Sequence, residues 1–257
     1  MPDDGGRPPW AYLDLLQSEP FFASYKKRVR ELLAPQRGAR HLDVGGGTGD
    51  DARAMADVCG FAAMVELRST HAYEARERGL TTAIVGDGAA LPFATATFDT
   101  CVLDRVLQHV DEPSAILDEV ARVLRGNGRV VTIDPDLDTQ VIDLDATDLA
   151  RRIFRYRTDV ARPSGTVARR TGSLLHRARF ANISVEARTL IVRDPTRVDN
   201  VMGLRHWAQF AHEHGDISAD EAAAWPLMID AAAAAGEFLY AVTYFISYGE
   251  MTWNSIR

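Results

Sequence analysis

The chain has 257 residues, of which 46% are hydrophobic and 25% are charged. This composition is typical of a globular protein and excludes collagen-like and wholly disordered chains. Acidic residues outnumber Lys and Arg by 36 to 29, and the resulting formal charge of −7 disfavours a nucleic-acid partner.

The first half of the chain alternates short apolar strands with amphipathic helices. Residues 10–33 carry apolar side chains at helical spacing and are interrupted at Pro20, which predicts two short helices. Further helices are expected at 50–58, 69–78 and 113–124, and strands at 41–44, 61–65, 82–85, 100–103 and 129–133. Strands that alternate with helices at this rhythm predict a parallel sheet covered on both faces.

The second half has a different pattern. Residues 137–178 are mostly charged and residues 199–236 are rich in Ala, so both segments are expected to be helical insertions. Residues 183–192 alternate in polarity, and residues 238–251 return to strand character. We therefore expect a single domain, 1–257, whose parts are a helical cap at 10–33, a core at 38–136, insertions at 137–178 and 199–236, and closing strands at 183–192 and 238–251.

The most informative segment joins the first strand to the helix after it. It reads Asp43-Val44-Gly45-Gly46-Gly47-Thr48-Gly49-Asp50. Its glycines let the backbone pass close to a ligand and expose the amides at the start of the next helix. A dinucleotide site needs G-x-G-x-x-G, but Asp50 stands where the third glycine would be. A carboxylate ahead of the loop suits a ligand that carries an amine, and a tight turn without a ligand is the alternative.

Four segments, in the same order, resemble the class I S-adenosylmethionine-dependent methyltransferases, in particular their small-molecule, type 11-like group. The glycine loop resembles motif I, and Glu66 ends the second strand where that family has an acid for the ribose hydroxyls. Gly86-Asp87-Gly88-Ala89-Ala90-Leu91-Pro92-Phe93 resembles its G-D-A-x-x-L-P-F segment, whose acid contacts the adenine amino group. Two further signatures of the family, F-D and L-K-P-G-G, are similar to Phe98-Asp99 and Leu124-Arg125-Gly126-Asn127-Gly128.

This resemblance implies an α/β fold that is Rossmann-like and doubly wound, with a mostly parallel seven-stranded sheet, an antiparallel last strand and helical lid insertions. It also implies S-adenosylmethionine as the cofactor, with no metal. The residues that it assigns to the cofactor are Asp43, Gly45, Gly47, Gly49, Glu66, Leu67, Asp87, Gly88 and Asp104. Three of these acids also have alternative roles that involve no ligand. Glu66 could stabilise the start of a helix, Asp87 could form a turn, and Asp104 could lie in a solvated loop.

Candidate catalytic residues follow the strands. His109 comes shortly after the fourth strand, where ligands bind in such sheets, and a neutral imidazole can accept a proton from the acceptor. Asp134 directly follows the fifth strand and is a second candidate base. The alternatives are a histidine that packs beside the cofactor and a solvated turn acid. His212-Glu213-His214 predicts no metal site, since residues two apart do not share a helix face.

Residues of the cap and of the insertions are candidates for binding the acceptor. The segment 151–197 contains twelve arginines and no lysine, so we predict that Arg155 or Arg157, with Arg155 as the choice, binds a carboxylate or phosphate. The alternative is that these arginines pair with the acidic segment 134–148. The other residues predicted to contact the acceptor are Tyr12, Tyr25, His206 and Trp207.

The predicted function is S-adenosylmethionine-dependent methyl transfer to a small molecule, a natural-product or quinone-like metabolite, by in-line displacement. Two alternatives are a non-catalytic module that binds the cofactor and an NAD-dependent oxidoreductase. Cys59 and Cys101 lie far apart without a CxxC motif, which is typical of a cytoplasmic protein without a zinc site. No apolar run approaches the roughly 20 residues of a membrane helix. We expect a monomer or homodimer without nucleic-acid or membrane partners.

Overall fold

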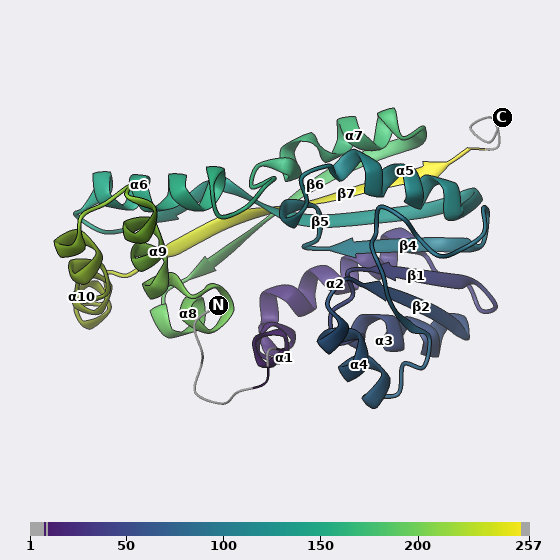
Figure 1. Cartoon of the computed structure of the whole chain (residues 1–257), viewed down its shortest axis with the longest axis horizontal. Coiled ribbons are helices and arrows are strands. Elements are labelled where there is room, and N and C mark those ends of the chain that lie inside the picture. Colours follow the sequence, from purple (N-terminus) through teal and green to yellow (C-terminus); the bar gives the residue numbers. More distant parts are fainter. Residues whose placement is uncertain (1–7, 9, 253–257) are drawn as a thin grey trace.

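The computed structural model describes residue 8 and residues 10–252 (Figure 1). Its strands are β1 (Arg40–Val44), β2 (Phe61–Glu66), β3 (Ala83–Val85), β4 (Phe98–Asp104), β5 (Leu124–Ile142), β6 (Phe180–Val192) and β7 (Tyr240–Met251). Its α-helices are α1 (Ala11–Ser18), α2 (Pro20–Leu33), α3 (Asp50–Cys59), α4 (Ser69–Glu77), α5 (Pro113–Val123), α6 (Thr147–Asp159), α7 (Thr171–Arg177), α8 (Pro195–Met202), α9 (Trp207–His214) and α10 (Ala219–Ala235). Its 3₁₀ helices are η1 (Leu107–His109), η2 (Val167–Arg170) and η3 (Leu204–His206).

The strands of this part of the chain form one seven-stranded sheet in the order β3-β2-β1-β4-β5-β7-β6. Neighbouring strands from β3 to β5 run parallel, and β7 is antiparallel to both β5 and β6. The Rossmann-like, mostly parallel sheet with an antiparallel last strand that the sequence predicts is therefore confirmed.

Helices cover both faces of the sheet because strand side chains point alternately to its two sides. Leu42 of β1 belongs to an apolar cluster with Ile116 of α5. Met64 of β2 and Val102 of β4 belong to a second cluster, which includes residues of α2 and α3. Asp43 is in register with both Met64 and Val102, so its carboxylate lies on the α2 and α3 side of the sheet.

Two helices precede the sheet, as the sequence predicts. Pro20 occupies the first turn of α2, where its fixed φ and its missing N–H do no harm. The helix ends where Ala34 adopts a left-handed conformation with φ of +41°. Phe22 and Tyr25 on its buried face belong to the cluster shared with α3. The cap thus packs directly on the sheet face that carries Asp43.

Strands β5 and β7 continue beyond the parallel part of the sheet and support the second half of the chain. Val141 and Ile142 pair with Ala241 and Tyr240 after a break in register that follows Asp136. The expectation of a helix at 137–142 is therefore wrong, because the strand pair extends through this segment. Figure 1 shows α6, α9 and α10 gathered on this extension, far from α3 and α4. We call this extension and its helices the lid lobe.

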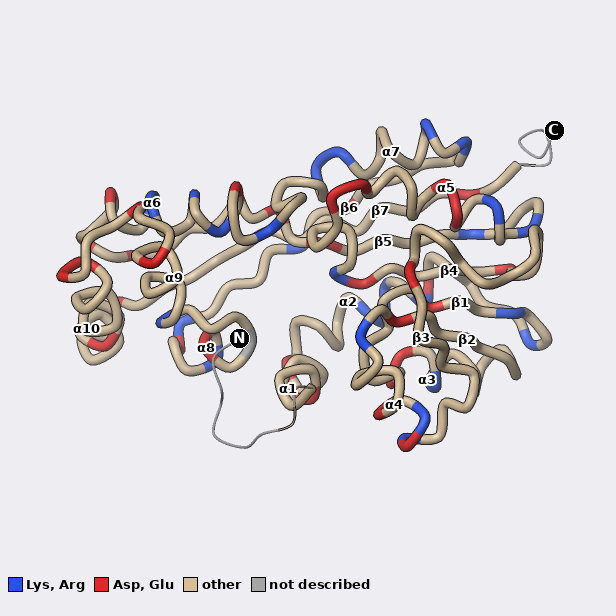
Figure 2. The backbone as a smooth tube through the Cα atoms, viewed as in Figure 1, with Lys and Arg blue, Asp and Glu red and all other residues tan. Residues whose placement is uncertain are grey.

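Acidic and basic side chains are mixed along the lid lobe. Arg152 pairs with Asp148 at 2.9 Å, and Arg169 pairs with Asp136. Figure 2 shows the two signs of charge side by side along α6. These ion pairs match the alternative in which the arginine-rich segment neutralises the acidic one. In the described part of the chain, no helix has the length and apolarity that crossing a bilayer requires.

Candidate active site

A cavity of about 1060 Å³ opens where the parallel strands end. The carboxyl ends of β1, β2 and β4 form one part of its wall, and residues of α1, α2, α6, α8 and α9 are among those that form the rest. Ligands bind at this edge of open α/β sheets, because the strand ends leave a crevice there. The volume is at the top of the range of about 300–1,000 Å³ for pockets that hold one small ligand, so there is room for two small molecules.

The loop between β1 and α3 runs along one side of the cavity. Gly45 and Gly47 adopt φ of +74° and +57°, a region that residues with side chains rarely occupy. A Cβ atom at Gly45 would stand 2.6 Å from Val106, and one at Gly47 would stand 2.9 Å from Leu13 of α1. Because these two glycines have no side chains, three parts of the chain can meet at the cavity: this loop, helix α1, and the segment that follows β4.

Gly49 does not line the cavity, although the sequence assigns it to the cofactor. Its φ is +76°, and a Cβ atom there would stand 2.9 Å from both Ala75 and Leu80. Glycine is needed at this position because the start of α3 packs closely on α4 and the turn that follows it. Its role in the structure is packing.

Glu66, at the end of β2, holds the glycine loop in place. Its Oε2 accepts a hydrogen bond from the Gly47 amide at 3.0 Å, and its Oε1 accepts one from the Arg68 amide at 2.9 Å. The side chain is buried but lines the cavity. Because each carboxylate oxygen can accept a second hydrogen bond, Glu66 retains the capacity to bind the two hydroxyls of a diol.

Asp43 lies among other carboxylates at the same end of the cavity. Burial raises the pKa of its carboxyl well above the usual range, the charges of Asp51 and Asp104 raise it further, and Lys26 opposes them. A positive charge placed beside Asp43 would offset this repulsion. The glycine-loop end of the cavity is therefore suited to a cation.

Asp104 ends β4 with its carboxylate in the cavity wall. Tyr25 of α2 donates a hydrogen bond to Oδ1 at 2.8 Å, and Nε of Arg105 donates to the same oxygen at 3.2 Å. Arg105 has φ of +59°, which is uncommon outside glycine and persists only where the surroundings impose it. This turn of the backbone lets Asp104, Arg105 and Val106 all line the cavity.

The remaining cofactor candidates lie on the loops after β2 and β3. Leu67 and Asp87 are exposed, and both border the cavity together with Gly88. The Asp87 carboxylate accepts a hydrogen bond from the Ala89 amide at 2.9 Å, so the turn role left open by the sequence is present. One carboxylate oxygen of Asp87 stays available for a ligand.

Comparison with known proteins identifies the family. A family model described as a methyltransferase domain matches residues 42–132, which include the glycine loop and Glu66. A ubiquinone/menaquinone biosynthesis C-methyltransferase of Roseobacter denitrificans is 34% identical over 119 residues, which are 43% of this chain and 48% of that protein. An uncharacterized 37.1 kDa protein in transposon TN4556 of Streptomyces fradiae is 32% identical over 249 residues, 94% of this chain and 71% of that protein. The chain belongs to the class I S-adenosylmethionine-dependent methyltransferases.

The likeness differs in extent between these proteins. The match to this chain covers about half, 48%, of the length of the Roseobacter denitrificans relative. The YcgJ protein from Bacillus subtilis has a similar structure, with a TM-score of 0.64 and 15% identity over 90% of this chain and 99% of that chain. At this identity the likeness shows a shared fold.

Of the two predicted bases, His109 reaches the cavity of the methyltransferase. It is the last residue of η1, and its ring lines the cavity. Burial lowers its pKa to about 4, and the positive charges of Arg162, Arg68 and Arg105 lower it in the same direction. The imidazole is therefore neutral at pH 7 and has a nitrogen free to accept a proton.

Asp134 does not reach the cavity, so the structure does not support its prediction as a catalytic base. Its neighbours Ile133 and Pro135 line the cavity, and alternation along β5 turns Asp134 to the other side. There, Oδ1 accepts a hydrogen bond from the Gln108 amide at 3.2 Å. Burial raises the pKa of Asp134 well above the usual range. Asp134 holds η1, the turn that carries His109.

The predicted acceptor residues divide into two groups. Tyr12, Tyr25, His206 and Trp207 all line the cavity. Arg155 does not, because it lies on the exposed face of α6. Positions two apart on a helix point roughly 200° from each other, so Arg157 faces the cavity where Arg155 cannot. Arg155 therefore does not line the cavity, whereas Arg157, the alternative to it, does.

Arg157 is buried, and none of residues 10–252 gives it an acidic partner. Its guanidinium carbon lies 3.3 Å from the centroid of the Trp207 ring, and burial lowers its pKa to about 9. Stacking on an indole contributes at most about 2 kcal/mol, whereas taking an unpaired charge out of water costs several kcal/mol. We therefore expect Arg157 to destabilise the free protein, which is typical of a residue retained for binding.

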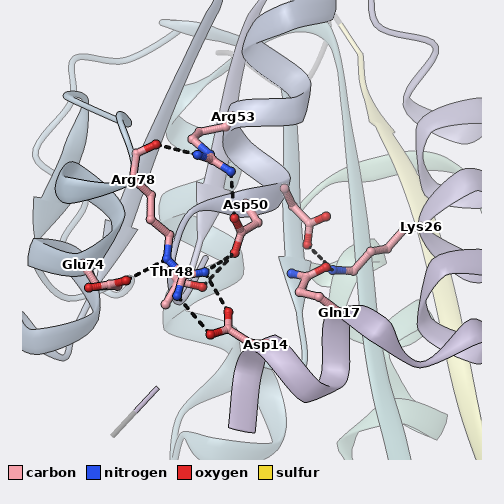
Figure 3. Close-up of polar contacts among 9 residues, drawn as sticks. Asp14, Gln17, Lys26, Thr48, Asp50, Arg53, Glu74 and Arg78 are labelled. Carbon is pink, nitrogen blue, oxygen red and sulfur yellow. Dashed lines mark hydrogen bonds and ion pairs between the residues drawn. The ribbon is translucent and has the colours of Figure 1, made fainter. Parts of the chain in front are cut away.

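Polar contacts hold α1 of the methyltransferase beside the glycine loop (Figure 3). Arg78 donates hydrogen bonds to Asp14 of α1 at 2.7 Å and to Asp50 of α3 at 3.0 Å. Lys26 of α2 donates to Gln17 of α1 at 2.7 Å. These contacts fix α1 where Tyr12 and Leu13 line the cavity.

The histidines of the late insertion form no metal site with each other. His212 Nδ1 lies 3.1 Å from the Ile217 carbonyl oxygen, and His214 Nδ1 lies 2.9 Å from the Asp216 carboxylate. Within residues 10–252, no group of three or more His, Cys, Asp or Glu side chains is arranged to hold a metal ion.

Arg105, Arg162 and Tyr244 are among the cavity residues of the methyltransferase that the sequence analysis does not identify. Arg105 carries no local signal, since its positive φ is imposed by tertiary contacts. Arg162 precedes Pro163 in a turn, a pattern that marks a loop without indicating where the side chain points. Tyr244 lies in β7, where alternation predicts a buried side chain but not a cavity.

Proposed function

We propose that this methyltransferase transfers the methyl group of S-adenosylmethionine to a small-molecule acceptor by in-line displacement. The observation that carries the proposal is the hydrogen bond from the Gly47 amide to Glu66, which joins the glycine loop to the acid after β2 at the wall of one cavity. The runner-up cofactor, a dinucleotide, would place its pyrophosphate near Asp50. That carboxylate is negative and already pairs with Arg78.

The acidic end of the cavity fits this methyl donor in charge. S-adenosylmethionine carries an amine and a sulfonium and supplies an activated methyl group. In the proposal, Asp43 and Asp104 face its positive groups, and a cation there offsets the burial and the carboxylate repulsion that together raise the pKa of Asp43. Glu66 accepts hydrogen bonds from the ribose hydroxyls with the lone pairs that the backbone amides leave free.

The two loops beside this end complete the proposed cofactor site. Gly45 and Gly47 allow close approach of the backbone to the amino-acid part of the cofactor. Leu67, Asp87 and Gly88 border the region proposed for adenine. In this assignment Gly49 acts indirectly, by packing the start of α3.

The lid end of the cavity receives the acceptor. Trp207 of α9 lines this end, and Tyr12 lines the cavity from α1, beside the glycine loop. In the proposal both side chains position the acceptor for the displacement. An acceptor hydroxyl or activated carbon loses a proton as it attacks the methyl group. His109 is neutral at pH 7, because burial lowers its pKa to about 4, and it is the proposed proton acceptor.

We infer a quinone-like or natural-product metabolite as the acceptor. The Roseobacter denitrificans relative is a ubiquinone/menaquinone biosynthesis C-methyltransferase, and aromatic side chains such as Tyr156, Trp207 and Phe210 line the lid end here. The proposed compartment is the cytoplasm, which is supported by the free thiols of Cys59 and Cys101. The proposed assembly is a monomer or a homodimer.

Calorimetric titration with S-adenosylhomocysteine, the expected product, tests the cofactor. We expect micromolar binding that Glu66→Ala weakens by about tenfold or more, since two charge-assisted hydrogen bonds are lost. Glu77→Ala, which removes an exposed acid from α4, is the matched control and should bind as the native chain does. NADH should give no binding heat.

Three results would change the proposal. Absence of S-adenosylhomocysteine binding would overturn it, and NADH binding in its place would favour an oxidoreductase. Binding without release of S-adenosylhomocysteine from S-adenosylmethionine, when hydroquinone, phenol and amine probes are supplied, would favour the non-catalytic module.

A further inference from the structure

One arginine of the cavity lies in an unusual environment. Arg157 of α6 lines the cavity with 8% of its surface exposed, and its Nε has no hydrogen-bond partner in the described residues. Its guanidinium carbon lies 3.3 Å from the centroid of the Trp207 ring. The indole therefore covers one face of the guanidinium, and the N–H groups at its edge remain for a ligand.

Several other arginines of the lid lobe and the cap pair with carboxylates. Arg28 pairs with Glu186 at 2.6 Å, and Arg152 pairs with Asp148 at 2.9 Å. Among residues 10–252, the groups that act electrostatically on Arg157 are Tyr240, Tyr244 and another arginine, with no carboxylate among them. Arg157 is thus a buried cation that the described part of the chain leaves without a counter-ion.

A second arginine lies at the same end of the cavity. Arg162 is half-buried, lines the cavity, and its Nε also has no partner in the described residues. Burial is the main cause of the lowered pKa of Arg157, and the positive charge of Arg162 lowers it in the same direction. Two like charges in a medium of low dielectric repel each other. An anion bound beside both arginines would attract each of them and so offset this repulsion.

We propose that the acceptor carries an anionic group, a carboxylate or a phosphate, which Arg157 binds at the lid end of the cavity with Arg162 nearby. The guanidinium edge matches either group with two parallel hydrogen bonds. This inference rests on the proposed methyl transfer to a small molecule. Asp43 of β1 and Asp104 at the end of β4 line the same cavity, whereas Arg157 lies on α6. The cavity therefore offers carboxylates to a cation and a guanidinium to an anion on different elements, which orients the acceptor.

The test uses the full chain saturated with S-adenosylhomocysteine and three probes of similar shape: benzoate, phenyl phosphate and neutral benzamide. Calorimetry should show at least one anion binding about tenfold or more tightly than benzamide. The two anions distinguish carboxylate from phosphate recognition.

Three variants assign the effect to one side chain. Arg157→Met should weaken anion binding by about tenfold or more and leave benzamide binding unchanged. Arg157→Lys should recover part of the affinity, because it keeps the charge but loses the planar fork. Arg155→Met, on the exposed face of the same helix, should change nothing. Unchanged S-adenosylhomocysteine affinity in all three shows that they fold.

The proposal is overturned if benzamide binds as tightly as both anions, if no anion binds, or if Arg157→Met leaves anion affinity unchanged. A native chain that fails to bind S-adenosylhomocysteine would contradict the proposed function instead. The anion titrations are then repeated on the unliganded chain. If Arg157→Met loses the preference for anions over benzamide there, the anion site is supported. If the variant keeps that preference, the site is refuted.

Discussion

The hydroxyl group of Tyr25 in α2 donates to both carboxylate oxygens of Asp104 at the end of β4, at 2.8 and 3.0 Å. The tyrosine is buried, and its ring packs against Phe21, Phe22 and Tyr244. This hydrogen bond joins the cap to the sheet at the end of the cavity proposed for the cofactor. The cap is therefore part of the proposed cofactor site as well as its cover.

Tyr25→Phe should weaken both folding and cofactor binding. The Asp104 carboxylate keeps Arg105 as a partner, so the free energy of unfolding should fall by only about 1 kcal/mol in urea titrations. The affinity for S-adenosylhomocysteine should fall several-fold, because the carboxylate is less well oriented. Tyr73→Phe, on the exposed side of α4, is the control. Unchanged affinity in Tyr25→Phe would separate the cap from the cofactor site.

Two glycines at opposite ends of α3 form a matched pair. Gly49 and Gly60 have φ of +76° and +89°, but only Gly49 is crowded, since a Cβ atom there would stand 2.9 Å from both Ala75 and Leu80. Gly60→Ala should therefore cost about 1 kcal/mol for the backbone alone. Gly49→Ala should cost roughly 1–3 kcal/mol more, from overpacking. Equal losses in denaturant unfolding would show that the start of α3 can move away from α4.

Replacing Arg157 should stabilise the free protein. Arg157→Met removes a buried charge without a counter-ion and keeps most of the contact with Trp207. We expect the free energy of unfolding to rise by roughly 1–2 kcal/mol, as desolvation outweighs the lost stacking. Tm should rise by a few degrees in calorimetry. Arg155→Met should leave Tm unchanged, and a fall in Tm for Arg157→Met would identify Arg157 as a packing residue.

Acid should destabilise the protein through His109. Burial lowers its pKa to about 4 in the folded chain, whereas it is about 6.5 when unfolded, so the unfolded state binds a proton first as pH falls. Stability from this group is complete above about pH 6.5 and decreases between about pH 6.5 and 4. Because the side chain is partly exposed on the cavity surface, solvent screens the effect, and the loss from pH 7 to pH 5 should be at most about 1 kcal/mol. His109→Gln should lose less stability over this range. His176→Gln, at an exposed position, should follow the native profile.

Loss of the contacts around Arg78 should loosen α1. Arg78→Met removes ion pairs to Asp14 and Asp50, each worth about 0–1 kcal/mol near the surface, so overall stability should change little. The affinity for S-adenosylhomocysteine should nevertheless fall several-fold, because α1 lies against the glycine loop. Arg125→Met, which breaks the ion pair with Asp99 far from the cavity, is the control. Equal affinities for the two variants would argue against α1 as part of the site.

Local signals account for the parts of this molecule that were predicted well. The alternation of strands and helices up to about residue 134 follows apolar periodicity, and the glycine loop follows from the conformations that glycine allows. The segment 137–142 was predicted wrongly because its strand pairs with β7, about a hundred residues later in the chain. A charged segment at the end of a sheet reveals nothing of such a distant partner.

The direction in which a side chain points also depends on more than the local sequence. Asp134 and Arg155 were chosen for residue type and position, and each lies one or two residues from a residue that faces the cavity. On a strand a shift of one residue reverses the face, and on a helix a shift of two does nearly the same. Residue type alone cannot resolve this difference.

The sequence by itself determined the fold class and identified the residues proposed for the cofactor. A strand, a glycine turn and an acid after the next strand are local features, and parallel strands bring their carboxyl ends to one edge. Only the tertiary structure decided which residues surround the end proposed for the acceptor. The register of α6 and the long pairing of β5 with β7 place Arg157 against Trp207, inside the cavity and without a counter-ion, and these contacts join residues far apart in the chain.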